Sequence, residues 1–418
     1  MGVLFGTGSA VYHAAVRVAA LWHPKAKAWV RGREGLWERL ERKASVLRGG
    51  LWMHCASVGE FEQGRPVLEA IKAERPELPV LLTFFSPSGY EARKNEPLAT
   101  HVDYLPPDGK ADAERLVQLI APRAAVFVKY EFWYHHLHAL NKAGVPTFLI
   151  SALFRPDQPF FRWYGWDWRS MLRCFAHIST QDDASRLLLQ QLGLQQVSTG
   201  GDTRYDRVVT IARHTEALPL AAAFKGDTPT VVCGSTWPAD ETLLRKAMAA
   251  RRAKSIIVPH EPTEQHLTDI EAGFPRPLVR WSELEGTTPE NIRATVGATP
   301  EGTLLVDRMG LLARLYRHGE VAYVGGGFGD GIHNLLEAAV WGRPVIMGPR
   351  HTKFPEAAGL LAAGAAAEVR NADELAAALR SLLDDPERWQ RASDAAARYV
   401  QERIGATERV LQVLRPVL

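Results

Sequence analysis

"YVGGGFGDGIHNLLEAAVWGRPVIMG", residues 323–348, is the stretch from which the fold is most readily predicted. An apolar strand runs into three glycines, a loop leads to His333 and Asn334, and a helix begins at Leu335, before a second apolar strand. Glycines let a backbone approach a ligand closely, and a helix N-terminus offers unpaired N–H groups to a phosphate. A capping box of Asn334 and Glu337 is the simpler interpretation, but it leaves the glycine run unexplained.

The same alternation of apolar strands and helical patterns extends from about residue 50 to the end of the sequence. The predicted strands lie in "GLWMHCA", "LPVLLTF", "AAVFVK", "PTFLI", "FAHIS", "PTVVCG", "KSIIVP", "GTLLVD", "VAYVGG" and "RPVIMG". Strands that are apolar throughout are buried on both faces, which is typical of parallel sheets covered by helices. The segment 207–228 separates the two strand series, so the sequence predicts two doubly wound α/β domains, 1–207 and 208–418. The final helix is expected to cross back to the first domain.

Composition places the chain among globular enzymes. Its 418 residues suit two domains, and 46% hydrophobic with 23% charged residues excludes a disordered or fibrous protein. A net charge of +3 is too small to argue for nucleic acid. Three scattered cysteines without a C-x-x-C motif argue against a disulfide framework or zinc site and favour a reducing cytoplasm.

The N-terminal segment, about residues 1–48, is apolar and then basic and aromatic. Its apolar part is too short to span a bilayer, and it lacks the features of a signal peptide. Trp22, Trp29 and Trp37 stand among seven cations. This composition favours a segment that lies on anionic lipid, and the alternative is a helix whose tryptophans dock on the domain.

"SVGE", residues 57–60, places a carboxylate directly after the first predicted strand. Ser57 and Glu60 fit a capping box, but Pro66 follows closely, and proline is costly inside a helix. The main helix is therefore expected to begin near Arg65–Pro66. Glu60 would then lie in a strand-to-helix connection, stay ionised, and accept a proton as a general base.

Seven motifs carry a resemblance to a known family. They are "SVGE" at 57–60, "EFWYHHL" at 131–137, "GDTRYD" at 201–206, "GSTWPADE" at 234–241, "VPHEP" at 258–262, "DRMGLL" at 307–312 and "HNLLEAA" at 333–339. In this order the chain resembles the Kdo transferases of lipopolysaccharide synthesis, which move 3-deoxy-D-manno-octulosonic acid from CMP-Kdo onto lipid A precursor. The resemblance implies a GT-B fold, with an acceptor-binding first domain and a CMP-Kdo-binding second domain.

The resemblance also implies roles for individual residues. Glu60 matches the family's general base, and Lys129 and Arg204 match groups thought to stabilise the transition state. The CMP-contacting positions are His260, Glu261, Met309, Gly310, Leu311, Asn334, Leu335, Leu336 and Glu337. Two positions depart from the family: many relatives have an acidic residue in place of Lys129, and Arg-His in place of His260-Glu261. Pairing with Asp202 or Asp206 is the alternative reading of Arg204.

The predicted enzyme needs no cofactor and no metal. The sequence has no D-x-D triplet, and His135, His136 and His138 are wrongly spaced for ligands on one helical face. We therefore expect a metal-independent glycosyltransferase on the cytoplasmic side of the inner membrane, acting on CMP-Kdo and lipid A precursor without nucleic acid. The alternatives are a sugar-nucleotide 2-epimerase of the same architecture, and a non-catalytic lipid- or nucleotide-binding protein.

Overall fold

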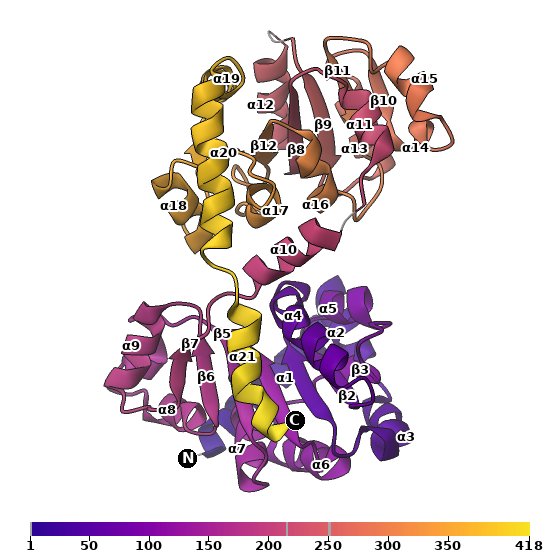
Figure 1. Cartoon of the computed structure of the whole chain (residues 1–418). Coiled ribbons are helices and arrows are strands. Elements are labelled where there is room, and N and C mark those ends of the chain that lie inside the picture. The colour runs from indigo at the N-terminus through magenta and orange to yellow at the C-terminus, as the bar shows by residue number, and fades with distance from the viewer. Residues whose placement is uncertain (1, 215, 250–251) are drawn as a thin grey trace. The chain divides into compact units, whose positions relative to one another are not determined.

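Each of the two strand series forms its own parallel sheet in the computed structural model, which describes residues 2–214, 216–249 and 252–418 (Figure 1). The first unit comprises Met1–Arg207 with Ile404–Leu418, and the second comprises Val208–Arg403. The second unit therefore ends at Arg403 and not at residue 418. Two parallel-sheet units of this kind make up the GT-B fold.

The first sheet has seven parallel strands in the order β3-β2-β1-β4-β5-β6-β7. They are β1 Leu51–Cys55, β2 Val80–Phe84, β3 His101–Tyr104, β4 Ala124–Val128, β5 Thr147–Ala152, β6 His177–Thr180 and β7 Val197–Thr199. The strand order reverses between β1 and β4, which pair directly. Ligands of such sheets bind outside the carboxyl ends of the strands at this switch point.

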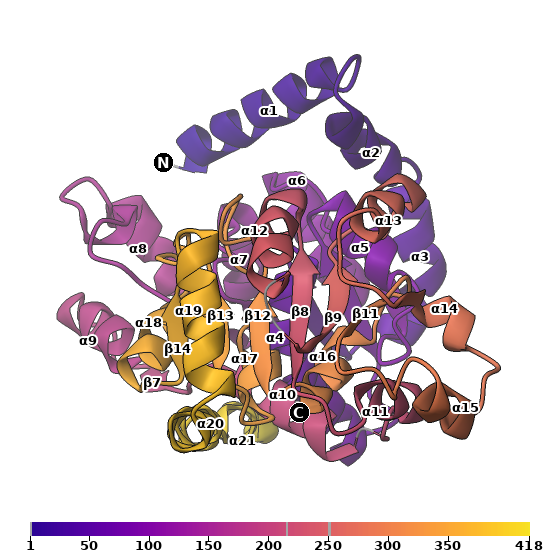
Figure 2. The same cartoon turned by 90° about the horizontal axis from the view of Figure 1, so that it is seen from above.

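Helices cover both faces of the first sheet. They are α1 Gly2–Ala19, α2 Pro24–Gly32, α3 Leu36–Leu47, α4 Val58–Glu74, α5 Pro87–Arg93, α6 Lys110–Ile120, α7 Tyr134–Lys142, α8 Trp166–Leu172, α9 Asp183–Gln191 and α21 Ala406–Leu414, with the short 3-10 helix η1 at Pro159–Phe161. Helix α10, Arg204–His214, begins in the first unit and continues into the second. Among these elements α1 is drawn at the edge of the unit, joined through a turn to α2 (Figure 2). No helix of the described ranges combines the length and the apolar content needed to cross a bilayer.

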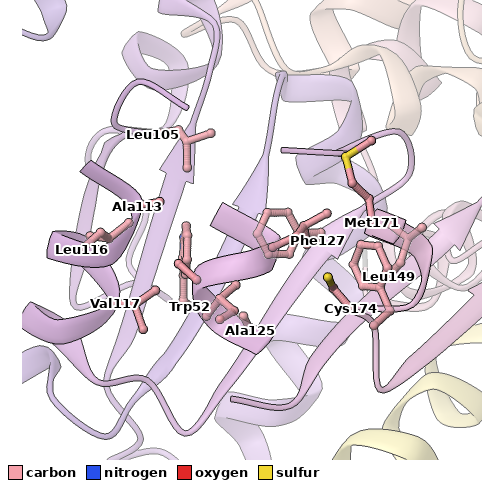
Figure 3. Close-up of a cluster of buried hydrophobic side chains, with 14 of the residues drawn as sticks. Trp52, Leu105, Ala113, Leu116, Val117, Ala125, Phe127, Leu149, Met171 and Cys174 are labelled. Carbon is pink, nitrogen blue, oxygen red and sulfur yellow. The ribbon is translucent and has the colours of Figure 1, made fainter. Parts of the chain in front are cut away.

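Side chains of β1 alternate between two cores because successive side chains point to opposite faces of a sheet. Trp52 packs with Phe127 of β4 and with apolar side chains of α3, α6, α7 and α8 (Figure 3). Met53 packs on the other face with α4 and α21. The last helix of the chain thus completes the core of the first unit.

The second sheet has seven parallel strands in the order β10-β11-β9-β8-β12-β13-β14. They are β8 Thr230–Thr236, β9 Lys254–Pro259, β10 Leu278–Arg280, β11 Gly302–Leu305, β12 Val321–Val324, β13 Val345–Met347 and β14 Ala366–Glu368. The accompanying helices are α11 Pro219–Lys225, α12 Pro238–Met248, α13 Glu264–Glu271, α14 Trp281–Leu284, α15 Pro289–Ala294, α16 Leu312–Leu315, the 3-10 helix η2 Tyr316–His318, α17 Leu336–Ala339, α18 Pro355–Ala362, α19 Ala372–Leu383 and α20 Pro386–Gln401. Here the switch point lies between β8 and β12.

Candidate active site

Glu60 lies in the first turn of α4, directly beyond the carboxyl end of β1. The Ser57 backbone N–H donates to Glu60 Oε2 at 3.0 Å, and the Glu60 N–H faces Ser57 Oγ at 3.4 Å. This is a complete capping box, so Glu60 is a helix cap. The prediction that the main helix begins near Arg65–Pro66 is wrong: α4 runs from Val58 through Pro66 to Glu74.

Packing explains why α4 tolerates its proline. A proline inside a helix costs about 3 kcal/mol. Phe61, Val67 and Leu68 of α4 are fully buried, and each buried side chain of this size contributes about 1.5–3 kcal/mol. The apolar face of the helix therefore outweighs the missing backbone hydrogen bond at Pro66.

The Glu60 carboxyl is an unusually weak acid. Burial and the nearby Glu131 carboxylate raise its pKa to about 7, although Lys129 and the backbone N–H groups of Ala56 and Ser57 act in the opposite direction. The sequence predicted an ionised Glu60, and with this pKa the carboxyl is about half ionised at neutral pH. A carboxyl with a pKa near 7 exchanges protons readily at physiological pH, which suits a general base.

Glu131 was not predicted as a site residue, and it is buried, with 5% of its surface exposed. His54 of β1 lies with its Nε2 2.9 Å from Glu131 Oε2, and the Trp133 indole N–H donates to the same oxygen at 2.6 Å. Thr83 Oγ1 lies 2.9 Å from His54 Nδ1. His54 Nδ1 also lies 3.1 Å from the Thr83 carbonyl oxygen, so contacts on both ring nitrogens fix the plane of the imidazole. Glu131 is thus held in place at the switch point between β1 and β4.

Lys129 is the first residue after β4 and adopts a left-handed backbone conformation, with φ of 71°. A non-glycine residue in this region costs roughly 1–2 kcal/mol, and such strain often accompanies functional sites. Its charge lowers the pKa of Glu60. The structure therefore brings two of the three predicted catalytic residues, Glu60 and Lys129, to one switch point.

Arg204 is the first residue of α10 and is already paired. Its guanidinium donates to Asp202 Oδ2 from Nε at 2.9 Å and lies 2.7 Å from it through the second nitrogen. The ion pair between Arg204 and Asp202, which was the alternative interpretation, is therefore present. Its presence does not test the predicted role of Arg204 in stabilising the transition state. Asp206 has another function. One of its carboxylate oxygens accepts the N–H of Gly405, just before α21, and the other accepts the N–H of Thr407 in the first turn of that helix.

In the second unit, His260 belongs to a stack of three aromatic rings. It follows β9 and lies between Trp237, at 4.7 Å between ring centroids, and His333, at 4.3 Å. The Trp237 indole N–H donates to His333 Nε2 at 3.2 Å. Burial and the neighbouring His260 lower the pKa of His333 to about 4, so His333 is neutral at physiological pH. Trp237 and His333 were missed as site residues, although both lie in the motifs quoted above.

The glycine run after β12 is explained by packing within the unit. A Cβ at Gly325 would lie 2.4 Å from the Ser235 carbonyl oxygen, and one at Gly327 would lie 2.7 Å from the backbone of Gly348. The Gly326 N–H donates to the buried carboxylate of Asp240 at 2.9 Å. Packing of protein backbone within the unit is therefore sufficient to require glycine at positions 325 and 327.

The remaining predicted positions also follow strands of the second sheet. Asn334 donates from Nδ2 to Glu337 Oε1 at 3.1 Å and accepts the Leu336 N–H at Oδ1, at the same distance. Helix α17 begins at Leu336, with Leu335 as its cap. Met309 is 75% exposed after β11, and Gly310 has a φ of 83° that favours glycine. Within the described ranges there is no group of three or more His, Cys, Asp or Glu side chains that could hold a metal ion.

Comparisons with known proteins agree with the motifs. The family model for 3-deoxy-D-manno-octulosonic-acid transferase (kdotransferase) matches residues 31–207. The chain is 30% identical to the 3-deoxy-D-manno-octulosonic acid transferase of Aquifex aeolicus, over 80% of this chain and 86% of that protein. It is 29% identical to the enzyme of the same name from Bordetella pertussis, over 97% of this chain and 99% of that protein.

A solved structure adds a likeness of fold. The UDP-GlcNAc 2-epimerase from Neisseria meningitidis bound to UDP-GlcNAc is similar with a TM-score of 0.59, covering 88% of this chain and 100% of that one. Its 13% sequence identity limits this likeness to the architecture. The sequence relatives are more specific, and they show that the chain is a glycosyltransferase that belongs to the family of 3-deoxy-D-manno-octulosonic acid (Kdo) transferases.

Proposed function

We propose that this enzyme transfers Kdo from CMP-Kdo onto a hydroxyl group of lipid A precursor (lipid IVA), in lipopolysaccharide synthesis, with Glu60 as the general base. The observation that carries the proposal is the Glu60 carboxyl at the switch point of the first sheet, with a pKa raised to about 7 by burial and by Glu131. A base of this strength is half deprotonated at neutral pH and still accepts a proton from an attacking hydroxyl.

In the proposed reaction, the acceptor oxygen attacks the anomeric carbon of Kdo. The bond from that carbon to the phosphate oxygen of CMP breaks, and its electron pair leaves with CMP. Glu60 takes the hydroxyl proton as the new bond forms. Lys129 and Arg204 stabilise the negative charge that grows on the leaving phosphate.

The donor is assigned to the second unit. The stacked rings of Trp237, His260 and His333 are the supporting observation, with Asn334–Glu337 and Met309–Leu311 at the same edge of the sheet. The chemistry requires no metal, because a carboxylate base and cationic side chains supply both the proton transfer and the charge stabilisation. Full activity in the presence of EDTA is expected, and a loss that magnesium restores would contradict this mechanism.

One assay tests the function. The enzyme is incubated with CMP-Kdo and lipid A precursor, and the product is analysed by mass spectrometry for added Kdo. Release of CMP without added Kdo would overturn the acceptor assignment. Turnover of a UDP-sugar in place of CMP-Kdo would favour the 2-epimerase alternative, and no turnover of any donor would favour a binding protein.

We also propose that the N-terminal segment binds the cytoplasmic face of the inner membrane. Its three tryptophans differ in exposure. Trp29 is buried and Trp37 packs against the core, whereas Trp22 is 70% exposed. The Arg33 side chain makes contacts within the unit: its guanidinium lies over the Trp29 ring at 3.8 Å and donates to the Phe85 carbonyl. We therefore do not count Arg33 among the cations that meet lipid.

Lys25, Lys27 and Arg31 are exposed and remain the cations expected to meet lipid. Replacing these three by Gln should weaken flotation with anionic vesicles, because each cation contributes about 1 kcal/mol of attraction that salt screens. Unchanged flotation at low salt would contradict this part of the proposal.

A further inference from the structure

The segment 155–173 of the first unit presents an aromatic tip to solvent. Trp163 is 90% exposed, more than any other large apolar side chain of the described residues, and Tyr164 and Trp166 are 52% and 47% exposed. The Trp163 and Tyr164 rings contact each other edge to face at 5.6 Å. Scattered exposed apolar residues are common, but three exposed aromatic residues within four positions of the chain, two of them with rings in contact, call for an explanation.

The tip is held outward by the loop beneath it. The Arg169 guanidinium donates to the carbonyls of Phe160 at 3.1 Å and Arg162 at 3.0 Å. Gly165 packs so closely that a Cβ there would lie 1.9 Å from the Pro159 carbonyl oxygen. Phe160 is 3% exposed and anchors the loop in the core. The exposure of the three rings is therefore built into the fold.

The charge around the tip is positive. The segment contains four arginines against two aspartates, and Arg155, Arg162 and Arg173 are exposed. Helix α7 contacts both α1 and α8, and both views draw the start of α1 beside α8 (Figures 1 and 2). Leu21 and Trp22, which follow α1 in the same unit, are 80% and 70% exposed.

We propose that the tip formed by Trp163, Tyr164 and Trp166 inserts into the headgroup region of an anionic bilayer, as a second membrane contact separate from residues 1–48. Tryptophan and tyrosine favour this region because one part of the ring system is apolar and the other polar, and flanking arginines attract anionic headgroups. Trp163, at 90% exposure, is open to solvent on nearly all of its surface, which suits contact with an extended surface, whereas the chains of a single bound lipid require a concave groove. The inference goes beyond the proposed function, because it concerns binding to vesicles that contain no acceptor.

Insertion can be measured at a single position. The three cysteines, Cys55, Cys174 and Cys233, are all buried, so a cysteine introduced on the surface of the full chain reacts selectively with a thiol-directed, environment-sensitive fluorophore. Labelled Tyr164→Cys should show a blue shift with vesicles of equal parts phosphatidylcholine and phosphatidylglycerol. Labelled Leu187→Cys, at a half-exposed position of α9, serves as the matched control and should show none.

Binding is tested with a triple variant, Trp163→Ser, Tyr164→Ser and Trp166→Ser. Its affinity for the same vesicles should fall at least about tenfold, while the control Leu187→Ser, at an exposed position of α9, should bind as the parent does. Circular dichroism and melting establish that the triple variant is folded, and Trp163→Ser alone is the fallback. The double variant Arg162→Gln and Arg173→Gln should bind the vesicles more weakly than the parent at low salt. At high salt, the two proteins should have equal affinity for the vesicles.

Two results would overturn the proposal. The first is an absent blue shift at position 164 together with unchanged vesicle affinity of a folded triple variant. The second is unchanged affinity for acceptor-free vesicles with a raised KM for detergent-dispersed acceptor, which would make the tip an acceptor contact. Transfer activity in detergent is measured in parallel, so that a failure of the proposed function is recognised separately.

Discussion

Glu60 combines two tasks that usually belong to different residues. Its Oε2 accepts the Ser57 N–H and thereby starts α4, while burial and Glu131 keep its proton affinity high. The cap fixes the carboxyl in space, and the environment sets its strength as a base. A glutamine retains the first property, because its side-chain oxygen also accepts the N–H, but it lacks the second.

Glu60→Gln is therefore expected to lower kcat by roughly 10²–10⁴-fold with little change in melting temperature or CMP affinity. Ser57→Ala is the matched control: it removes one half of the cap, at a cost of about 1 kcal/mol, and retains the base. Steady-state kinetics and thermal melts measure both effects. A Glu60→Gln enzyme that keeps most of its turnover and melts several degrees lower would show that Glu60 serves only as a cap.

Replacing Glu131 tests whether the pKa of Glu60 sets the pH dependence of kcat/KM. Because its negative charge raises the pKa of Glu60, kcat/KM should increase as pH rises through about 7 and Glu60 loses its proton. In Glu131→Gln, this limb of the profile should move to lower pH. His54→Gln, which removes the partner of Glu131 but not its charge, is the control for disturbed packing. An unmoved limb in Glu131→Gln would exclude electrostatic coupling between the two carboxyls.

The same pKa has a consequence for stability. The folded-state pKa of Glu60, about 7, lies above the ordinary glutamate value of 4.5, so between these values the folded state binds more protons than the unfolded state. Stability must then decrease as pH rises through this window. Urea denaturation at several pH values should show a smaller decrease for Glu60→Gln than for the parent. An equal decrease in both proteins would assign it to other groups.

Sequence reasoning identified Glu60 and Lys129 but not Glu131 and His54. Glu131 and His54 are 77 residues apart, and neither lies in a local pattern that points to the other. Only the pairing of β1 with β4 brings them together. The same holds for Trp237 and His333, which are 96 residues apart and meet because β8 pairs with β12. Motifs mark single positions, whereas sheet topology decides which positions meet.

At the scale of elements, the strands that sequence analysis missed are the four sheet edges. They are β3, β7, β10 and β14, of three or four residues each. Interior strands are buried on both faces and are apolar throughout, which makes them recognisable. Edge strands are short and polar, because a long apolar edge invites pairing with other chains. The features that protect an edge therefore also remove its signature from the sequence.

Helix α21 offers a stability test at this scale. Leu414 is fully buried against the core that α4 also covers, so Leu414→Ala should reduce the free energy of unfolding by about 2–5 kcal/mol. Val413, one position earlier and only partly buried, is the matched control, and its replacement by Ala should reduce the free energy of unfolding by less. Chemical denaturation measures both. Equal losses at the two positions would mean that α21 is not docked as described.

At the scale of the whole molecule, the second unit is an insertion within the first. The chain leaves the first unit after Arg207 and returns at Ile404. At this return, Asp206 accepts the N–H groups of Gly405 and Thr407. Sequence analysis predicted two domains, but a linear boundary cannot represent a unit made of two separate segments. The sequence predicted that the final helix crosses back to the first domain, and α21 packs there against α4.

A fragment comprising residues 208–403 is accordingly expected to fold alone and to bind CMP, as measured by calorimetry. The matched fragment 208–418 should bind CMP equally well but self-associate, because Val410, Leu411 and Leu414 would be exposed without the first unit. Sedimentation distinguishes the two fragments. A folded 208–403 fragment that fails to bind CMP would contradict the assignment of the donor to this unit.

The return of α21 also sets an order of events during protein synthesis. The ribosome must complete the second unit before residues 404–418 exist, which at bacterial elongation rates takes roughly 10–40 s. Throughout this interval the nascent first unit has an uncovered apolar surface where α21 will dock. The unit that is translated first is therefore the last to be completed, and its partly finished form is the species most in need of a chaperone.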